Sequence, residues 1–205
     1  MLEQEHTLTR RTRRHEETRR EILIAAWAQA EEHGIAALSL RELARAVGMR
    51  APSLYTYFDG KDAIYDAMFA EGYRALLDSY EEGGERDLEG PGRMEALGAA
   101  VERFVAFCQA SPARYQLMFT RAIPGWEPSP ESYAVSVEVY RRLTELLAAA
   151  GIEGDGALDL WTAVTSGLAA QQMANDPGGD RWRRLSRPAV QMMVEYLDRT
   201  RGTIP

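Results

Sequence analysis

The side chains best suited to bind another molecule gather in one short stretch of the chain, residues 39–61. An arginine fork can donate two hydrogen bonds to O6 and N7 of guanine, and hydroxyl and ammonium groups can bind base edges or phosphate oxygens. All of these groups occur here, on Ser39, Arg50, Ser53, Thr56, Tyr57 and Lys61. This set of donors suits the bases and phosphates of duplex nucleic acid.

The periodicity around these residues predicts two short helices joined by a glycine turn. Ser39 can cap the first helix, and Glu42 three residues later completes a capping box. Gly48 stands where the chain must turn, because glycine reaches positive φ without steric cost. The second helix should open near Ala51, since Pro52 is tolerated in a first helical turn. The apolar face of the first helix consists of Leu40, Leu43, Ala44 and Val47.

The second of these helices has an apolar side and a polar side. Leu54, Tyr55 and Phe58 lie three or four residues apart and are expected to pack in the core. The side chains left pointing outward are Arg50, Ser53, Thr56 and Tyr57. Two short helices joined by a tight turn form a helix-turn-helix, whose second helix enters the DNA major groove. Helical hairpins without a DNA role share this pattern, so the pattern alone leaves both interpretations open.

The run from Thr18 to Tyr65, about a quarter of the chain, resembles the N-terminal domain of the tetracycline-repressor (TetR) family of bacterial transcription regulators. The matching positions are Ile22, Leu23, Ala25, Ala26, Gly34, Leu40, Leu43, Ala44, Gly48, Leu54, Tyr55, Tyr57, Phe58 and Lys61. The resemblance implies phosphate contacts by Thr18, Tyr57 and Lys61, although a capping group near the helix start is the alternative for Thr18. Ser39 can add a phosphate contact from a helix N-terminus. The residues expected to contact DNA are Arg13, Arg14, Thr18, Ser39, Arg50, Ala51, Ser53, Thr56, Tyr57 and Lys61.

The net charge of −7 is distributed unevenly along the chain. Residues 1–61 hold ten Lys and Arg against nine Asp and Glu, a net of +1, and residues 62–205 hold fourteen against twenty-two, a net of −8. Residues 1–15 are predicted to be a flexible arm. Six arginines between residues 10 and 20 suit phosphates or the minor groove, although a solvated tail is the alternative. These are Arg10, Arg11, Arg13, Arg14, Arg19 and Arg20.

The chain as a whole is predicted to be all-α, with about nine helices in two domains. Residues 1–62 should form the arm and the helix-turn-helix, and residues 63–205 a helical domain for effector binding and dimerisation. Glycine and proline content predicts loops at residues 82–92 and 120–130. Besides the pair at residues 39–58, helices are expected at Glu16–His33, Lys61–Glu82, Arg93–Gln109, Pro112–Phe119, Tyr133–Ala150, Asp155–Asn175 and Ser186–Arg199.

The last two of these helices have apolar or small residues on more than one side. Small side chains permit a close approach of another helix, and a helix with two apolar faces needs two partners. A homodimer joined through these two helices is also what the family resemblance implies, although burial within one subunit is the alternative. The residues of the second faces are Ala163, Ser166, Gly167, Ala170, Met192 and Tyr196.

The middle of the chain is rich in aromatic and sulfur-containing side chains, most of which would be ordinary core if taken singly. Together they resemble the family's apolar ligand cavity, with Cys108, Gln116, Thr165 and Gln172 as candidate polar groups. We therefore expect a small apolar or aromatic effector, neutral or weakly charged. The expected ligand-binding residues are Phe104, Phe107, Cys108, Tyr115, Met118, Phe119, Trp126, Tyr140, Trp161 and Thr165.

An enzyme that modifies a small molecule, or an interaction module that does not bind DNA, are the alternatives. His6, His15 and His33 all lie in the first sixth of the chain, and no metal-ligand spacing or phosphate-binding glycine loop occurs. The sequence thus predicts no catalytic residue, metal or cofactor. It contains no run of eighteen apolar residues and no apolar signal core, so a cytoplasmic location without a membrane partner is expected.

Overall fold

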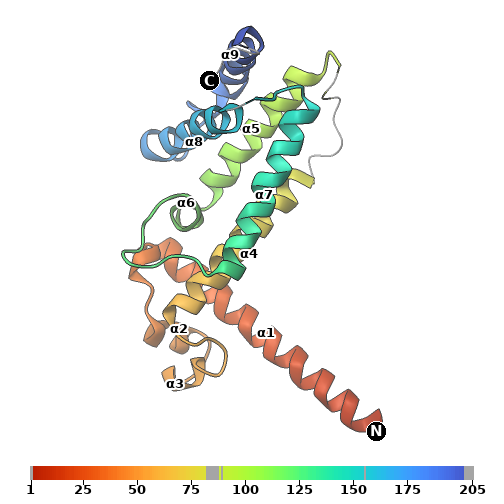
Figure 1. Ribbon diagram of the computed structural model, residues 1–205. Coiled ribbons are helices and arrows are strands. Elements are labelled where there is room, and N and C mark those ends of the chain that lie inside the picture. The colour runs from red at the N-terminus through yellow and green to blue at the C-terminus, as the bar shows by residue number, and fades with distance from the viewer. Residues whose placement is uncertain (1, 82–87, 89, 155, 201–205) are drawn as a thin grey trace. The chain divides into compact units, whose positions relative to one another are not determined.

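The computed structural model describes residues 2–81, 88, 90–154 and 156–200, and within them the chain is all-helical. Figure 1 labels the nine α-helices of the described residues, to which two short 3-10 helices are added, η1 at Ile35–Ala37 and η2 at Arg183–Leu185. The predicted all-α class is confirmed. The α-helices are α1 (Leu2–His33), α2 (Leu40–Ala46), α3 (Ala51–Leu54), α4 (Lys61–Glu81), α5 (Arg93–Ala110), α6 (Pro112–Phe119), α7 (Pro130–Ala149), α8 (Ala157–Asn175) and α9 (Ser186–Thr200).

Most predicted helix boundaries lie within three residues of those observed. Pro112 and Pro130 each begin a helix, as a residue without a backbone N–H can, and Gly151 with φ 67° follows the end of α7. Most of the predicted loop 82–92 lies outside the described residues. Asp155, the predicted start of the helix that ends at Asn175, lies outside them as well.

The predicted flexible arm is wrong, because α1 runs without a break from Leu2 to His33. The sequence over this range contains neither glycine nor proline, and its many Glu, Gln, Arg and Ala residues are good helix formers. Arg13 and Glu17, one turn apart, form an ion pair of 3.5 Å on the helix surface. Gly34, with φ 86°, lies beyond the C-terminal end, and its N–H donates to the Ala30 carbonyl.

The chain divides into two compact units. Unit 1 comprises residues 1–72 and 113–133, and unit 2 comprises residues 73–112 and 134–205. The continuous helices α4 and α7 contribute residues to both units.

The core of unit 1 joins α1 to the helix-turn-helix. Ile22, Ala26 and Ala30 are fully buried along one stripe of α1, as their spacing predicts. The other large buried side chains of residues 35–69 are Ile35, Leu38, Leu43, Leu54, Phe58, Ile64, Tyr65, Met68 and Phe69.

Tyr55 does not join this core, and its predicted burial is wrong. Helix α3 ends at Leu54 after only four residues, and the chain then turns at residues 55–57. Leu54 and Phe58 remain buried, whereas Tyr55 is 58% exposed. Because the turn directs Tyr55 away from the shared apolar side, its spacing from Phe58 does not lead to a contact in the core.

The core of unit 2 is the packing of α5 against α8 and α9. Helix α5 supplies the buried residues Leu97, Val101, Phe104, Val105 and Cys108. The α8–α9 pair supplies Trp161, Thr165, Ala169, Val190, Met193 and Leu197. In the described part of the chain, no helix combines the length and the low charge that a membrane crossing requires.

Candidate nucleic-acid interface

A side chain of α1 secures the N-terminus of α2. Ser39 is the N-cap, and its Oγ accepts a hydrogen bond from the Glu42 N–H at 3.5 Å. The Ser39 N–H donates to Gln29 Oε1 at 2.9 Å, and Gln29 Nε2 donates to Glu42 Oε2 at 2.7 Å. In a capping box the glutamate side chain usually accepts a hydrogen bond from the backbone N–H of the N-cap residue. Here Gln29, rather than Glu42, accepts that hydrogen bond from Ser39. The result is a closed set of three residues that ties α1 to the start of α2.

The segment expected to enter the major groove begins at Arg50. Gly48 has φ 70° and turns the chain after α2, and Arg50 is the extended N-cap of α3. The side chains of Arg50, Ser53 and Thr56 are exposed, and Ala51 is half-buried. The predicted base-reading side chains Arg50, Ser53 and Thr56 are therefore accessible to a ligand.

Tyr57 is held from one side by α1. The His15 ring stacks on the Tyr57 ring, with centroids 4.7 Å apart and an interplanar angle of 26°. One turn further along α1, the Arg19 guanidinium lies 4.1 Å from the Phe58 ring centroid and donates to the Tyr57 carbonyl oxygen. Two residues of α1 thus fix both the ring and the backbone of Tyr57.

Lys61 is anchored within unit 1 as well. Its Nζ donates to the Ala36 carbonyl at 3.3 Å and lies 5.4 Å from the Tyr65 ring centroid. The Tyr65 hydroxyl donates to the Ile35 carbonyl at 3.1 Å, so both side chains hold η1 against α4. An ammonium group has three donors, and two of those on Lys61 remain for an anion.

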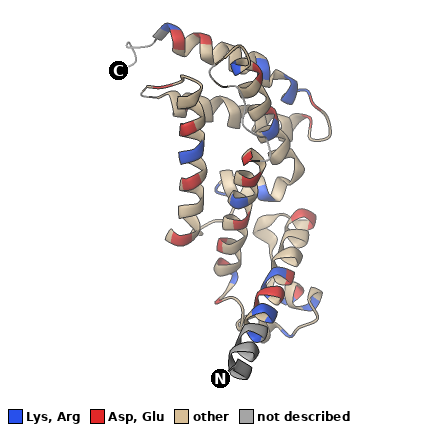
Figure 2. Ribbon diagram, turned by 90° about the vertical axis from the view of Figure 1, so that its right-hand side faces the viewer, with Lys and Arg blue, Asp and Glu red and all other residues tan. Residues whose placement is uncertain are grey.

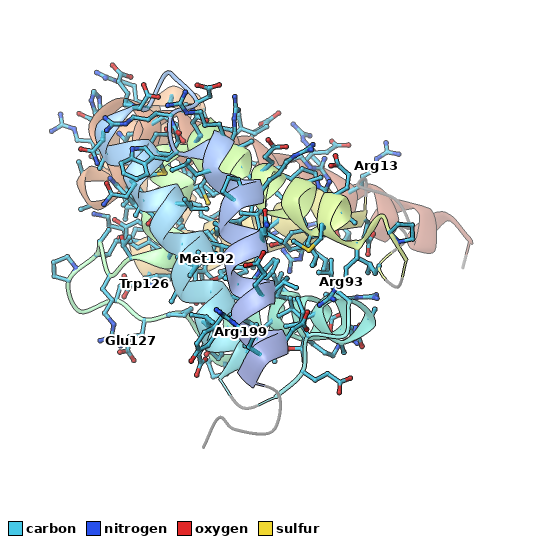
Figure 3. The ribbon with its side chains drawn as sticks, turned by 90° about the horizontal axis from the view of Figure 1, so that it is seen from above. Arg13, Arg93, Trp126, Glu127, Met192 and Arg199 are labelled. Carbon is cyan, nitrogen blue, oxygen red and sulfur yellow. The ribbon has the colours of Figure 1, made fainter. Side chains whose placement is uncertain are left out.

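The predicted contacts from α1 differ in their surroundings. Thr18 is half-buried, whereas Arg13 and Arg14 are exposed. Arg13 is paired with Glu17, and Figure 3 labels its side chain on α1.

The sequence interpretation missed Gln29, His15 and Arg19 as parts of this surface. Helical spacing gives a signal for two of them, because Arg19 and His15 lie three and seven residues before the buried Ile22. Nothing in the spacing signals the bond from Gln29 to Ser39, since that bond depends on how two helices meet.

The predicted ligand-binding residues fall in both units. Trp126, in the loop between α6 and α7, packs edge-on against Tyr65 and Phe69, with ring centroids 5.8 Å and 5.9 Å apart. Tyr115 and Phe119 of α6 contact each other at 5.7 Å. Unit 1 contains Tyr115, Met118, Phe119 and Trp126, and unit 2 contains Phe104, Phe107, Cys108, Tyr140, Trp161 and Thr165.

Two of the four candidate polar groups, Thr165 and Gln172, have side-chain hydrogen bonds within the protein. Thr165 Oγ1 donates to the Trp161 carbonyl at 2.8 Å. Gln172 is completely buried, its Oε1 accepts from the Trp182 and Arg183 N–H groups, and its Nε2 donates to the Asp176 and Gly179 carbonyls. The suggestion that Gln172 is a ligand contact is therefore corrected, because its carboxamide holds the connection between α8 and α9.

Tyr80 of α4 is a titratable group of unit 2 that the sequence interpretation did not single out. Burial raises the pKa of its phenol, the neighbouring Cys108 and Tyr140 raise it further, and Arg103 lowers it. Tyr80 lies four residues after the buried Leu76, so helical spacing would have indicated it.

Helices α8 and α9 expose the second faces that the sequence predicted. Ala163 and Gly167 of α8 are exposed, and no heavy atom lies within 4 Å of where a Gly167 Cβ would stand. On α9, Met192 is 60% exposed and Tyr196 is 46% exposed. Figure 3 labels Met192 on this helix together with Arg199.

Comparison with known proteins shows that the segment containing the helix-turn-helix is similar to a known family. Residues 22–68 match the family model described as bacterial regulatory proteins, tetR family. The HTH-type transcriptional regulators Rv1816 of Mycobacterium tuberculosis and Mb1846 of Mycobacterium bovis are each 27% identical over 165 residues, covering 75% of this chain and 67% of the relative. The matched family and relatives are transcription regulators, not enzymes.

Solved structures share the fold over most of the chain. The regulatory protein SCO4313 superposes with a TM-score of 0.72 at 22% identity, covering 90% of this chain and 98% of that one. The TetR family regulator PfmR from Thermus thermophilus superposes with a TM-score of 0.61 at 22% identity, covering 85% and 97%. At this identity the structural likeness concerns the fold.

Proposed function

We propose, from the premise that the chain belongs to the TetR family of DNA-binding transcriptional regulators, that it is a repressor which a small apolar effector releases from a palindromic operator. The observation that carries the proposal is the exposed set of Arg50, Ser53 and Thr56 on a segment that α1 holds at Tyr57. We assign DNA binding to residues 1–62, and effector binding and dimerisation to residues 63–205. The repressor would act in the cytoplasm, where the operator is.

Base recognition is assigned to the start of α3. Arg50 would donate its fork to a guanine, and Ser53 would contact a neighbouring base edge. Thr56 would contact a base or a phosphate, while Tyr57, Lys61, Ser39 and Thr18 would bind phosphates and fix the register. The hydrogen bonds of Gln29 and Arg19 and the stacking of His15 support this assignment, because they order the contact residues before DNA arrives.

The homodimer is assigned to α8 and α9. Their exposed small and apolar residues suit the close packing of a second copy, which gives a four-helix interface. A two-fold dimer presents two recognition segments, so the operator would be palindromic, with half-sites spaced by helical turns of DNA.

The effector is expected to be bulky and apolar or aromatic, such as a drug or a secondary metabolite. The aromatic and sulfur-containing side chains of α5–α8 and the Trp126 loop support this chemistry. The effector would favour a setting of α4 and the helix-turn-helix that fits the operator poorly. It can lower operator affinity only by the ratio of its own affinities for the two states, so effector and operator must weaken each other equally.

The test is a binding titration of the purified chain with the DNA upstream of its own gene. Arg50→Ala should weaken binding by roughly tenfold or more and relax the preference at one base pair, since a bidentate pair contributes about 1–3 kcal/mol of discrimination. Arg184→Ala, at an exposed arginine of unit 2, is the control and should bind as the wild type does. Equal affinity of the wild type for this DNA and for an unrelated duplex would refute the proposal.

A further inference from the structure

We infer that α1 extends the DNA-binding surface beyond the helix-turn-helix, with Arg11 as an additional phosphate contact and His15 as the residue that positions Tyr57. The inference rests on the proposed function, and it replaces the predicted flexible arm with a helix that has a defined contact side. Figure 1 shows α1 as one continuous helix that projects beyond α2 and α3.

The first step is the fixed orientation of Tyr57. Its ring stacks on His15, and its carbonyl accepts a hydrogen bond from Arg19, so neither ring nor backbone is free to reorient. Its side chain remains partly exposed, next to the exposed Thr56. A phosphate bound by the Tyr57 hydroxyl would therefore lie close to the α1 turn that carries His15.

The second step is the helical register of α1. At 100° per residue, Arg11 and His15 each lie within about 20° of the buried Ile22 when viewed along the axis. They extend the stripe that packs on the helix-turn-helix. Arg20 lies on the opposite side of the helix and is exposed.

The third step is distance and charge. Arg11 precedes His15 by four residues, a rise of about 6 Å. Phosphates recur about every 3.4 Å along each strand of a duplex, so a backbone bound by Tyr57 offers a further phosphate to a guanidinium at that distance. The Arg11 side chain is exposed, and among the described side chains it has no ion pair, whereas Arg13 is paired with Glu17.

The first experiment compares Arg11→Ala with Arg20→Ala in the full chain. Operator affinity is measured by fluorescence anisotropy at several salt concentrations. Arg11→Ala should weaken binding about five- to tenfold and reduce the slope of log K against log salt by about one, as the loss of one phosphate contact requires. Arg20→Ala should stay within about twofold of wild type with an unchanged slope. Equal losses in the two variants would overturn the Arg11 contact.

The second experiment separates positioning by His15 from a general loss of structure. His15→Phe keeps an aromatic ring to stack on Tyr57 and should retain most of the affinity, whereas His15→Ala should lose about three- to tenfold. In a Tyr57→Phe background, which lacks the hydroxyl, His15→Ala should have little further effect. An undiminished loss in that background, or no rescue by phenylalanine, would overturn the role of His15.

The two proposals fail in different ways. If the wild type does not prefer its own upstream DNA, the proposed function fails. If the wild type prefers that DNA and Arg50→Ala binds it more weakly, while Arg11→Ala and Arg20→Ala behave alike, only the inference about α1 fails.

Discussion

At the scale of single residues, the polar side chains that connect elements distinguish this molecule from a generic helical hairpin. Gln29 and Gln172 each have a carboxamide that both donates and accepts, and each bonds to groups near a helix end. A backbone N–H at a helix start has no partner within the helix, so a side chain from another element can satisfy it and fix the angle of approach. Glutamine at position 29 therefore links two helices by hydrogen bonds.

Gln29→Ala should destabilise unit 1. The change removes two hydrogen bonds and leaves the partly buried Ser39 N–H without its acceptor, at a cost of about 1–2 kcal/mol. Urea unfolding followed by circular dichroism measures the loss. Gln191→Ala is the control, because that glutamine bonds to Glu195 on the surface of a single helix and should cost a few tenths of a kcal/mol at most. Similar midpoints for the two variants would contradict the bridging role.

The raised pKa of Tyr80 predicts a loss of folding stability at alkaline pH. Burial raises the pKa of its phenol above the ordinary 10, so the folded state binds a proton that the unfolded chain releases first. The stability that Tyr80 contributes is therefore complete below pH 10 and is lost as the pH rises from there towards the folded pKa. Tyr80→Phe should lose less stability than wild type between pH 8 and pH 10.5 in urea unfolding.

The control for this prediction is Tyr55→Phe, at an exposed tyrosine. It should lose as much stability as wild type over the same pH interval. If Tyr80→Phe also followed the wild type, ionisation of Tyr80 would not be the cause of the alkaline loss.

At the scale of elements, glycine, proline and periodicity were sufficient to predict the helices, because local steric limits decide where a helix begins and ends. The α6 start at Pro112 and the turn at Gly48 follow from the sequence alone, whereas α7 begins at Pro130, three residues before the predicted start at Tyr133. The helical N-terminus of α1 was missed because many charges suggested a solvated tail, although no residue there breaks a helix. Tyr55 was misplaced because spacing cannot reveal that α3 ends after four residues. Bonds from Gln29 and Gln172 depend on tertiary packing, which no local pattern contains.

The packing of α5 on α9 is predicted to depend on Gly98. A Cβ at this position would stand 2.8 Å from Arg187 Cγ, closer than side chains tolerate, and 3.6 Å from Arg187 Cα, an ordinary contact. Overpacking costs about 1–3 kcal/mol, whereas the gain in helix propensity from alanine is about 1 kcal/mol, so Gly98→Ala should be net destabilising by roughly 1 kcal/mol. Thermal unfolding measures the change.

The double variant Gly98→Ala/Arg187→Ala tests the cause of that loss. Removing Cγ of Arg187 relieves the clash, and the accompanying loss of the exposed Arg187–Glu95 pair, 2.6 Å long, costs little. The double variant should therefore be more stable than Gly98→Ala alone. If it were less stable, the close approach of α5 and α9 would not explain the glycine.

At the scale of the whole molecule, charge and exposed apolar surface suggest separate roles for different parts of the chain. Residues 62–205 hold the net charge of −8, so general attraction for DNA is confined to the N-terminal stretch and its arginines. In Figure 2 the left-hand helix, α7, carries alternating acidic and basic residues. These include Glu138, Arg141, Arg142 and Glu145, which form a surface network of ion pairs. The exposed apolar residues of α9 and the small residues of α8 therefore suit a protein partner better than DNA.

The proposed dimer can be tested at Gly167 without disturbing the subunit. Because no heavy atom lies within 4 Å of a Cβ at this position, Gly167→Arg should leave the single chain folded, with an unchanged circular dichroism spectrum. In a dimer formed by close packing of α8, the same arginine would insert a charge between two helices, so light scattering should report a monomer. Operator affinity should then fall at least a hundredfold, because the second half-site no longer adds to binding. Gly178→Arg, at a loop glycine with equally open surroundings, is the control and should remain dimeric. If Gly167→Arg stayed dimeric and bound the operator like the control, the second copy must pack on another face of the molecule.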